Sequence, residues 1–393
     1  TFLIGRDTRI SGSMLESALA AGICSVGGNV VIAGVIPTPA VAYLVRQQGF
    51  DAGAVISASH NPYPDNGIKF FDSNGYKLPD EVEDELEKYV RQSADNELAR
   101  PTGDGIGKIE FNSNLAHLYA HFVRHTIDTS LEGLTIVYDG ANGAASSVGP
   151  EILSGLGAKV ININVNPDGL NINHHCGSTH IEGLQVAVQQ HNADLGIAND
   201  GDADRCLLVD EKGQVLDGDQ IMLLCALKLK EEGKLKGDTI VGTVMSNIGF
   251  HKAAEELGMK TVSTAVGDRY VLEYMREHNL SVGGEQSGHV IFLDHNTTGD
   301  GMLTAVQVAA LMKEKKQPLS ELAGIMTKYP QVLVNVRVAT KTGWEDNDLI
   351  KAAIVTAEGE LGDEGRVLVR ASGTEPLIRV MAEGPDQETL QSL

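Results

Sequence analysis

Short apolar runs alternate with longer amphipathic stretches along most of the chain. The apolar runs are bounded by Gly, Pro, Asn and Asp and are too short for helices, so they predict buried strands. The first part of the chain reads strand, helix, strand, helix, strand over residues 2–4, 13–25, 29–33, 39–48 and 52–56. This order is typical of a parallel sheet covered by helices.

The same order returns twice. The second copy covers residues 134–138, 144–155, 159–164, 181–191 and 195–198, and the third covers residues 239–243, 248–257, 260–264, 268–278 and 281–282. In the remainder, a strand at 332–338 and a helix at 346–358 precede two strands that flank residues 370–376. We therefore predict an α/β fold: three similar βαβαβ domains with mixed, mostly parallel sheets (1–111, 112–211 and 212–326) and a smaller α+β C-terminal domain (327–393).

The net charge of the protein limits which molecules it can bind. Of 393 residues, 53 are acidic and 31 are Lys or Arg, which gives a net charge of −22. This balance argues against nucleic acid or an anionic membrane as a partner. An anionic substrate would need arginines gathered in a cleft, because the overall field repels it.

The cysteines and the chain ends bear on location. Cys24, Cys176, Cys206 and Cys225 are scattered without paired spacing, so we expect a reducing, cytoplasmic environment. No apolar run approaches membrane-spanning length, and no signal peptide opens the chain. Because a strand pattern begins directly after Thr1 and a helical pattern is cut at residue 393, we expect both ends to be truncated.

A polar loop, Ser57-Ala58-Ser59-His60-Asn61-Pro62, which we call the serine loop, follows the third predicted strand. Open α/β sheets place ligand chemistry at the carboxyl ends of such strands. Lys69 lies between apolar neighbours in the short strand that comes next. A surface turn is the simpler interpretation, but similar loops end the other two repeats.

The second repeat ends on Asp200, Asp202 and Asp204. Their alternation predicts three carboxylates that face one point, which suits a hard divalent cation such as Mg²⁺ or Mn²⁺. A calcium EF-hand is excluded, because Arg205 stands where that loop needs glycine and a strand follows at Cys206. A solvated acidic turn is the remaining alternative.

Two further loops carry groups that recognise sugars and phosphates. The third repeat ends on Gly284-Glu285-Gln286-Ser287-Gly288-His289, which combines a carboxylate, a hydroxyl and an imidazole. The C-terminal domain carries Arg370-Ala371-Ser372-Gly373-Thr374 and Arg379, which predict a phosphate cradle. No Walker loop occurs, and a β-turn with surface arginines is the alternative.

Two other clusters contain side chains that bind anions or metals in other proteins. Arg6 and Arg9 follow the first strand, and we expect Arg6 to pair with Asp7 while Arg9 faces the cleft. His174, His175, Cys176 and His180 crowd one loop without the paired spacing of a zinc site, so no zinc is predicted.

Taken in order, the four loops resemble the motifs of the α-D-phosphohexomutases, and the resemblance spans nearly the whole chain. Gln286, residues 5–12 and residues 266–270 are more similar to the bacterial branch that acts on glucosamine phosphates than to the phosphomannomutase branch. The family normally opens with a Gly-Thr-Asp-Gly-x-Arg-Gly segment, which is missing here. The resemblance implies four domains around a central cleft.

The resemblance also implies roles for single residues. Ser59 would carry the phosphoryl group and, with the three aspartates, hold Mg²⁺. The other positions with an implied role near proton transfer and charge compensation are Arg9, His60, Lys69, Arg205 and His289. Sugar hydroxyls would be bound by Glu285 and Ser287, and the distal phosphate by Arg370, Ser372, Gly373, Thr374 and Arg379.

The implied reaction interconverts glucosamine 6-phosphate and glucosamine 1-phosphate through a hexosamine bisphosphate, which also acts as activator, on the route to UDP-N-acetylglucosamine and peptidoglycan precursors. A phosphoglucomutase or phosphomannomutase of the same family is the alternative. A serine phosphatase and a non-catalytic sugar-phosphate binding protein are rivals, although no G-x-S-x-G elbow is present. The partners would be small sugar phosphates. A homodimer stays open.

Overall fold

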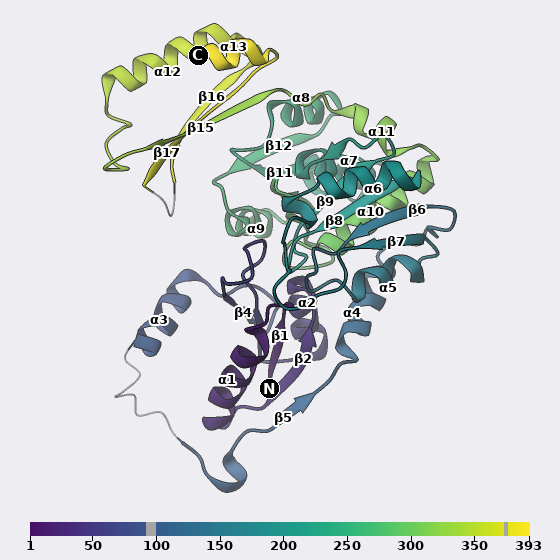
Figure 1. Ribbon diagram of the computed structural model, residues 1–393. Coiled ribbons are helices and arrows are strands. Elements are labelled where there is room, and N and C mark those ends of the chain that lie inside the picture. The colour runs from purple at the N-terminus through teal and green to yellow at the C-terminus, as the bar shows by residue number, and fades with distance from the viewer. Residues whose placement is uncertain (92–99, 373–375) are drawn as a thin grey trace.

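The computed structural model describes residues 1–91, 100–372 and 376–393. Four units follow one another along the chain, from the purple N-terminal unit to the yellow C-terminal one (Figure 1). The first three each contain a sheet covered by helices, and the fourth is a small sheet with two helices. The predicted fold class is confirmed. None of the helices in the described residues is long and apolar enough to cross a membrane.

The first sheet has the order β4-β3-β1-β2-β5, and all of its pairs are parallel except β3–β4. Its elements are β1 (Phe2–Arg6), α1 (Gly12–Ser25), β2 (Val30–Val35), α2 (Thr38–Gln48), β3 (Ala52–Ile56), β4 (Ile68–Asp72), α3 (Asp80–Arg91) and β5 (Ile109–Phe111). Strand β5 was not predicted, because it is short and all three of its residues are exposed.

The second sheet has the order β10-β9-β8-β6-β7, and the third has the order β12-β11-β13-β14. The second unit contains α4 (Leu115–Arg124), β6 (Thr135–Asp139), α5 (Val148–Gly155), β7 (Lys159–Ile163), α6 (Glu182–His191), β8 (Leu195–Asn199), β9 (Cys206–Asp210) and β10 (Val215–Leu216). The third contains α7 (Gly218–Glu231), β11 (Thr239–Thr243), α8 (Ile248–Glu256), β12 (Lys260–Thr264), α9 (Asp268–Glu277), β13 (Val282–Gly284), β14 (Val290–Phe292), α10 (Gly301–Lys315) and α11 (Leu319–Leu322).

Each of these three sheets repeats one local arrangement. The third strand of each repeat, β3, β8 or β13, pairs with the next strand in antiparallel orientation. The polar loops predicted from the sequence therefore join two neighbouring strands at the same edge of each sheet. This shared geometry fixes both ends of every loop.

Helix α10 lies at the centre of the protein. Every residue from Gly301 to Met312 is buried, and one hydrophobic cluster runs through α10 and the first three units. Burying one Leu, Val or Met side chain contributes about 1.5–3 kcal/mol, so this shared core holds the three units in a fixed arrangement.

The fourth unit has an antiparallel sheet of order β15-β17-β16 and its own small core. Its elements are β15 (Gln331–Arg337), α12 (Asp348–Leu361), β16 (Arg366–Ala371), β17 (Leu377–Glu383) and α13 (Gln387–Ser392). Glu383 at the end of β17 is fully buried against the third unit. Its carboxylate accepts hydrogen bonds from Asn247 Nδ2 and Ile248 N, both at 3.2 Å, and from Arg366 Nε at 2.6 Å.

Asp219 lies beside this junction and carries a pH-dependent contribution to stability. Its carboxylate is buried and accepts a hydrogen bond from Asn247 N at 2.7 Å. Burial and the neighbouring Asp217 raise the pKa of Asp219 from 3.8 to about 7. Between those two values the folded protein binds a proton that the unfolded chain releases, so this contribution to stability falls as the pH rises from about 4 to about 7.

Asp219→Asn should therefore remove that slope. We expect the stability of wild type relative to the variant to decline from pH 4 to 7 and to stay level above that range, as measured by thermal unfolding across pH. The exposed Asp346→Asn is the control and should show no such trend. A wild-type–variant difference that does not change with pH would contradict the assignment.

Candidate active site

Three of the four predicted loops meet at one point. Ser59 Oγ of the first unit donates a hydrogen bond to Asp200 Oδ2 of the second unit at 2.9 Å. Lys69 Nζ lies 2.7 Å from Asp202 Oδ2 and 3.5 Å from Asp204 Oδ2. His289 of the third unit places Nδ1 3.6 Å from Asp204 Oδ2. The structure thus brings together the serine, the lysine, the three aspartates and the histidine.

The three aspartates can hold a metal ion. One ligand atom from each lies within 4.8 Å of the others, and no other His, Cys, Asp or Glu group in the described residues has this spacing. All three side chains are buried, and Asp202 Oδ1 and Asp204 Oδ1 have no hydrogen-bond partner there. Buried carboxylate oxygens without donors fit a divalent cation.

A turn produces this convergence. Strand β8 ends at Asn199, so the aspartates lie in the polar loop that follows it. They lie in a turn in which Ala203 has a φ of 56°. That left-handed residue reverses the backbone and brings Asp204 back toward Asp200.

Electrostatics at the triad favour a cation. Burial and the nearby Asp204 and Asp202 raise the pKa of Asp200 well above its ordinary value. Burial opposes the charged form of Asp204, but Lys69 and His289 hold its pKa well below the usual range. Burial also opposes the charged form of Lys69, yet Asp202 and Asp204 raise its pKa. Lys69 and Arg205 beside three carboxylates still leave excess negative charge that a divalent cation would offset.

Ser59 is held in a strained backbone conformation. Its φ is 52°, in the left-handed region that residues with a side chain seldom adopt. Its amide donates to Ser57 Oγ at 3.0 Å, and Ser57 Oγ donates to Asp7 Oδ2 at 2.6 Å. Strain of this kind clusters at functional sites, where surrounding contacts fix it.

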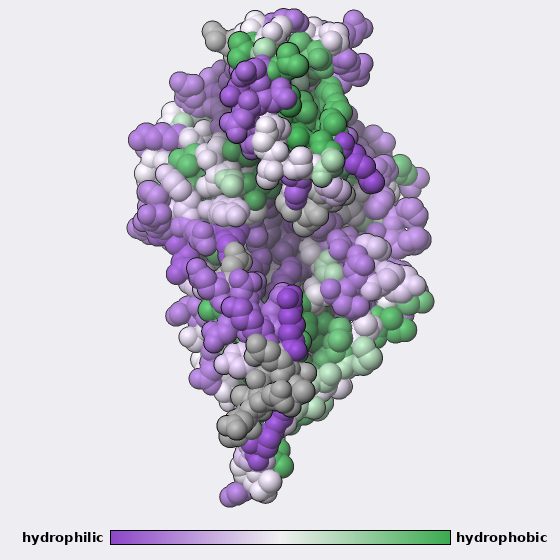
Figure 2. Space-filling model, turned by 90° about the vertical axis from the view of Figure 1, so that its left-hand side faces the viewer, coloured by the Kyte–Doolittle hydropathy of each residue, from purple (hydrophilic) through white to green (hydrophobic). Residues whose placement is uncertain are grey.

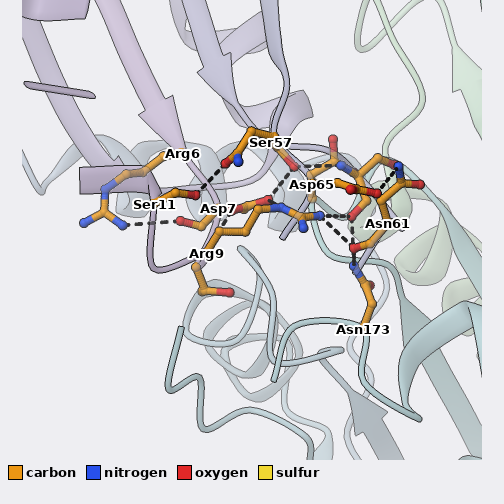
Figure 3. A network of polar contacts seen from close by, with 12 residues as sticks. Arg6, Asp7, Arg9, Ser11, Ser57, Asn61, Asp65 and Asn173 are labelled. Atoms are coloured by element: carbon orange, nitrogen blue, oxygen red, sulfur yellow. Dashed lines mark hydrogen bonds and ion pairs between the residues drawn. The ribbon is translucent and has the colours of Figure 1, made fainter. Parts of the chain in front are cut away.

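Arg9 does not line an open cleft as expected. Its side chain is 2% exposed and lies beneath the serine loop, where Nη2 donates to Ser59 O at 3.0 Å and to Asn61 O at 2.9 Å (Figure 3). Its Nε pairs with Asp7 Oδ2 at 2.9 Å, whereas Arg6 pairs with Glu16 at 3.2 Å. The predicted pairing of Arg6 with Asp7 is thus reversed, and Arg9 supports the loop from inside.

His60 and Arg205 lie at the edge of this cluster. His60 is exposed on the serine loop, and partial burial and the Arg205 charge lower its pKa. Arg205 Nε is 3.9 Å from Asp204 Oδ1. Burial opposes its charge, but Asp200 and Asp204 raise its pKa above the ordinary value. Arg205 is therefore a permanent cation beside the triad.

The third loop presents one buried and two accessible groups. Ser287 is exposed, and Glu285 accepts a hydrogen bond from Gly267 N at 3.1 Å. His289 is 2% exposed, and its Nε2 accepts a hydrogen bond from Gly299 N at 3.1 Å. Because Nε2 is an acceptor, a neutral imidazole ring carries its proton on Nδ1, which faces Asp204. Asp268, which was not predicted as a site residue, lies 3.7 Å from Nε2.

The fourth-unit residues form a separate group. Arg370 and Arg379 lie opposite one another on β16 and β17, and Ser372 follows β16. Burial and the charge of Arg379 lower the pKa of Arg370, so an anion between them would be favoured. Gly373 and Thr374 lie outside the described residues. Hydrophilic residues line the recess between this unit and the first one (Figure 2).

Fold and site together define an α/β enzyme with a serine beside a cation-binding triad and paired arginines on a separate unit. Family profiles of the phosphoglucomutase/phosphomannomutase α/β/α domains I, II and III match residues 1–97, 115–213 and 217–329. The profile of the C-terminal domain matches residues 333–393. The chain belongs to the phosphoglucomutase/phosphomannomutase family, as its motifs indicated.

Similar proteins agree with this result. A phosphoglucosamine mutase of Desulforamulus reducens is 56% identical over 391 residues, which cover 100% of this chain and 88% of the relative. A phosphoglucomutase/phosphomannomutase family protein of Burkholderia thailandensis has the same fold, with a TM-score of 0.80, 23% identity and coverage of 100% and 86%. The N-acetylphosphoglucosamine mutase of Aspergillus fumigatus, solved with GlcNAc-6P and magnesium, gives a TM-score of 0.68, 20% identity and coverage of 96% and 91%.

Proposed function

We propose that this chain is a phosphoglucosamine mutase, which interconverts glucosamine 6-phosphate and glucosamine 1-phosphate. The observation that carries the proposal is the 2.9 Å contact between Ser59 Oγ and Asp200 of the triad. A hydroxyl in that position can accept and return a phosphoryl group next to a bound cation. The 56% identity to a named phosphoglucosamine mutase supports the amino-sugar substrate.

The first step transfers the phosphoryl group of phosphorylated Ser59 to the free hydroxyl of the sugar phosphate. The Ser59 O–P bond breaks, a new O–P bond forms on the sugar, the sugar hydroxyl loses its proton, and Ser59 Oγ gains one, so that the net proton count is unchanged. Asp200, Asp202 and Asp204 would hold Mg²⁺, which neutralises charge on the transferring phosphoryl group when bound. Lys69 and Arg205 offset the remaining negative charge, and His289, whose Nδ1 lies 3.6 Å from Asp204 Oδ2, would move a proton.

The second step returns the other phosphate of the hexosamine bisphosphate to Ser59. The sugar bisphosphate must reverse its orientation between the two steps, so each of its two phosphates is bound at the distal position in one of them. Arg370, Ser372 and Arg379, with Gly373 and Thr374 beyond the described residues, would grip whichever phosphate is distal. Glu285 and Ser287 would bind the sugar hydroxyls. The bisphosphate also re-phosphorylates enzyme that has lost its phosphoryl group, and thereby activates it.

A substrate panel tests the proposal. We expect glucosamine 6-phosphate to be turned over faster than glucose 6-phosphate or mannose 6-phosphate, with dependence on Mg²⁺ and on a trace of bisphosphate, as followed by phosphorus NMR. Equal or faster turnover of the glucose or mannose compound would assign a phosphoglucomutase or phosphomannomutase instead. Release of inorganic phosphate without bisphosphate dependence would indicate a phosphatase.

A further inference from the structure

The serine loop is held from two sides. From the first unit, Arg9 donates to the carbonyl oxygens of Ser59 and Asn61. From the second unit, Asn173 Nδ2 donates to the same two oxygens, at 2.9 Å and 3.0 Å (Figure 3). Asn173 lies between β7 and α6, far from the triad in sequence, and no predicted function included it.

Asn173 is itself fixed in place. Its side chain is 6% exposed, its φ is 58°, and its amide donates to Ala141 O at 2.9 Å. Gly201, which lies between two of the aspartates, packs closely against the same two atoms. A Cβ at this position would lie 2.6 Å from Ser59 O and 2.7 Å from Asn173 Nδ2, which is too close for a side chain. The Ser59 carbonyl is therefore enclosed by the second unit at the point where the triad begins.

This arrangement is important because the proposed nucleophile and the proposed metal ligands lie on different units. Ser59 belongs to the first unit and the triad to the second. Arg9 ties the serine loop only to its own unit, so it fixes the shape of the loop without fixing its distance from Asp200. Among the residues that the structure describes, Asn173 is the side chain that ties the loop carbonyls to the unit carrying the triad.

We propose that Asn173 is a positioning residue, which holds the backbone of Ser59 in register with the aspartate triad across the interface of the two units. The inference rests on the proposed function, because it assigns the cause of the serine geometry that phosphoryl transfer needs. A misplacement of about 1 Å at a reacting centre costs on the order of a hundredfold in rate. Asn173 acts through the Ser59 and Asn61 carbonyls, so its loss should affect the chemical step and leave substrate affinity unchanged.

The test compares Asn173→Ala with Thr8→Val. Thr8 Oγ1 donates to Asn142 O at 2.6 Å across the same interface, so its variant loses an interface hydrogen bond but none to the serine loop. In single-turnover experiments on phosphorylated enzyme, we expect the rate constant of Asn173→Ala to fall about 10- to 100-fold with KM within about twofold. Thr8→Val should keep the wild-type rate constant. A merely structural role for Asn173 would lower the active fraction and leave the rate constant unchanged.

Hydrogen–deuterium exchange gives a readout that does not depend on catalysis. Asn173→Ala should speed exchange of the backbone amides of residues 57–61, while Thr8→Val should leave them as in wild type. If Asn173→Ala keeps both the wild-type rate constant and the wild-type protection of this loop, the inference is overturned. If the wild type fails to turn over glucosamine phosphates, the proposed function fails, and the exchange measurement still decides whether Asn173 holds the loop.

Discussion

Ser59→Ala is expected to reduce mutase turnover below detection while leaving the protein folded. The substitution removes the Oγ that contacts Asp200 and with it the atom that would carry the phosphoryl group. The side chain sits on a partly exposed loop and buries no apolar surface, so the melting temperature should change by only a few degrees. Turnover and circular dichroism of the purified variant measure both effects.

The matched control is Ser17→Ala. Ser17 lies on helix α1, where its hydroxyl donates a hydrogen bond to Ser13 O of the same helix at 2.8 Å. It should retain wild-type turnover. If Ser59 carries the phosphoryl group as proposed, intact mass should show one added phosphate in wild type and in Ser17→Ala and none in Ser59→Ala. Activity above a trace in Ser59→Ala would show that the nucleophile is a residue other than Ser59.

Asp202→Asn is expected to weaken cation binding and to lower kcat on the order of a hundredfold or more. Asp202 is fully buried, and its Oδ2 accepts from Lys69 Nζ at 2.7 Å and from Thr38 Oγ1 at 2.6 Å. Its other oxygen has no hydrogen-bond partner in the described residues and is the one left to bind a cation. In the variant, an amide NH₂ must face either these donors or the cation, and both arrangements are unfavourable.

The measurements are the Mg²⁺ dependence of turnover and the rise in melting temperature on adding Mg²⁺, which should shrink in the variant. The control is Asp65→Asn. Asp65 is an exposed carboxylate three residues after the serine loop, bonded to Asn61 Nδ2 at 3.1 Å, and it lies outside the triad. An unchanged Mg²⁺ dependence in Asp202→Asn would exclude Asp202 as a metal ligand.

Local sequence patterns were sufficient to predict much of the fold and of the candidate site. Strands β1, β3 and β8 were predictable because a short apolar run with polar loops at its ends has few other solutions. Helix α10 was not predicted, because residues buried on every side show no amphipathic period. Helix α5 begins later than expected, at Val148, since residues 144–147 form turns instead.

Among the residues of the site, too, only those in contiguous motifs could be predicted from the sequence. Ser59 and the aspartates could be found because each motif is contiguous in sequence. The contacts of Arg9 could not, because its guanidinium binds the carbonyls of Ser59 and Asn61, which lie 50 and 52 residues away. Asn173 lies 114 residues from Ser59, and an asparagine in a polar loop carries no signal of such a contact. Pairing across units depends on the tertiary fold.

The burial of Glu383 has a mechanical consequence for the fourth unit. Its carboxylate fixes one end of β17 to the third unit, while Arg379 lies nearer the other end of the strand. Four residues of extended chain span about 14 Å, so a pivot of about 15° at Glu383 would carry the Arg379 backbone by about 4 Å. Such a pivot would convert a small rotation at this buried contact into ångström-scale movement of the Arg379 guanidinium group. Movement on that scale would suit the turning of the sugar bisphosphate that the proposed reaction requires between its two steps.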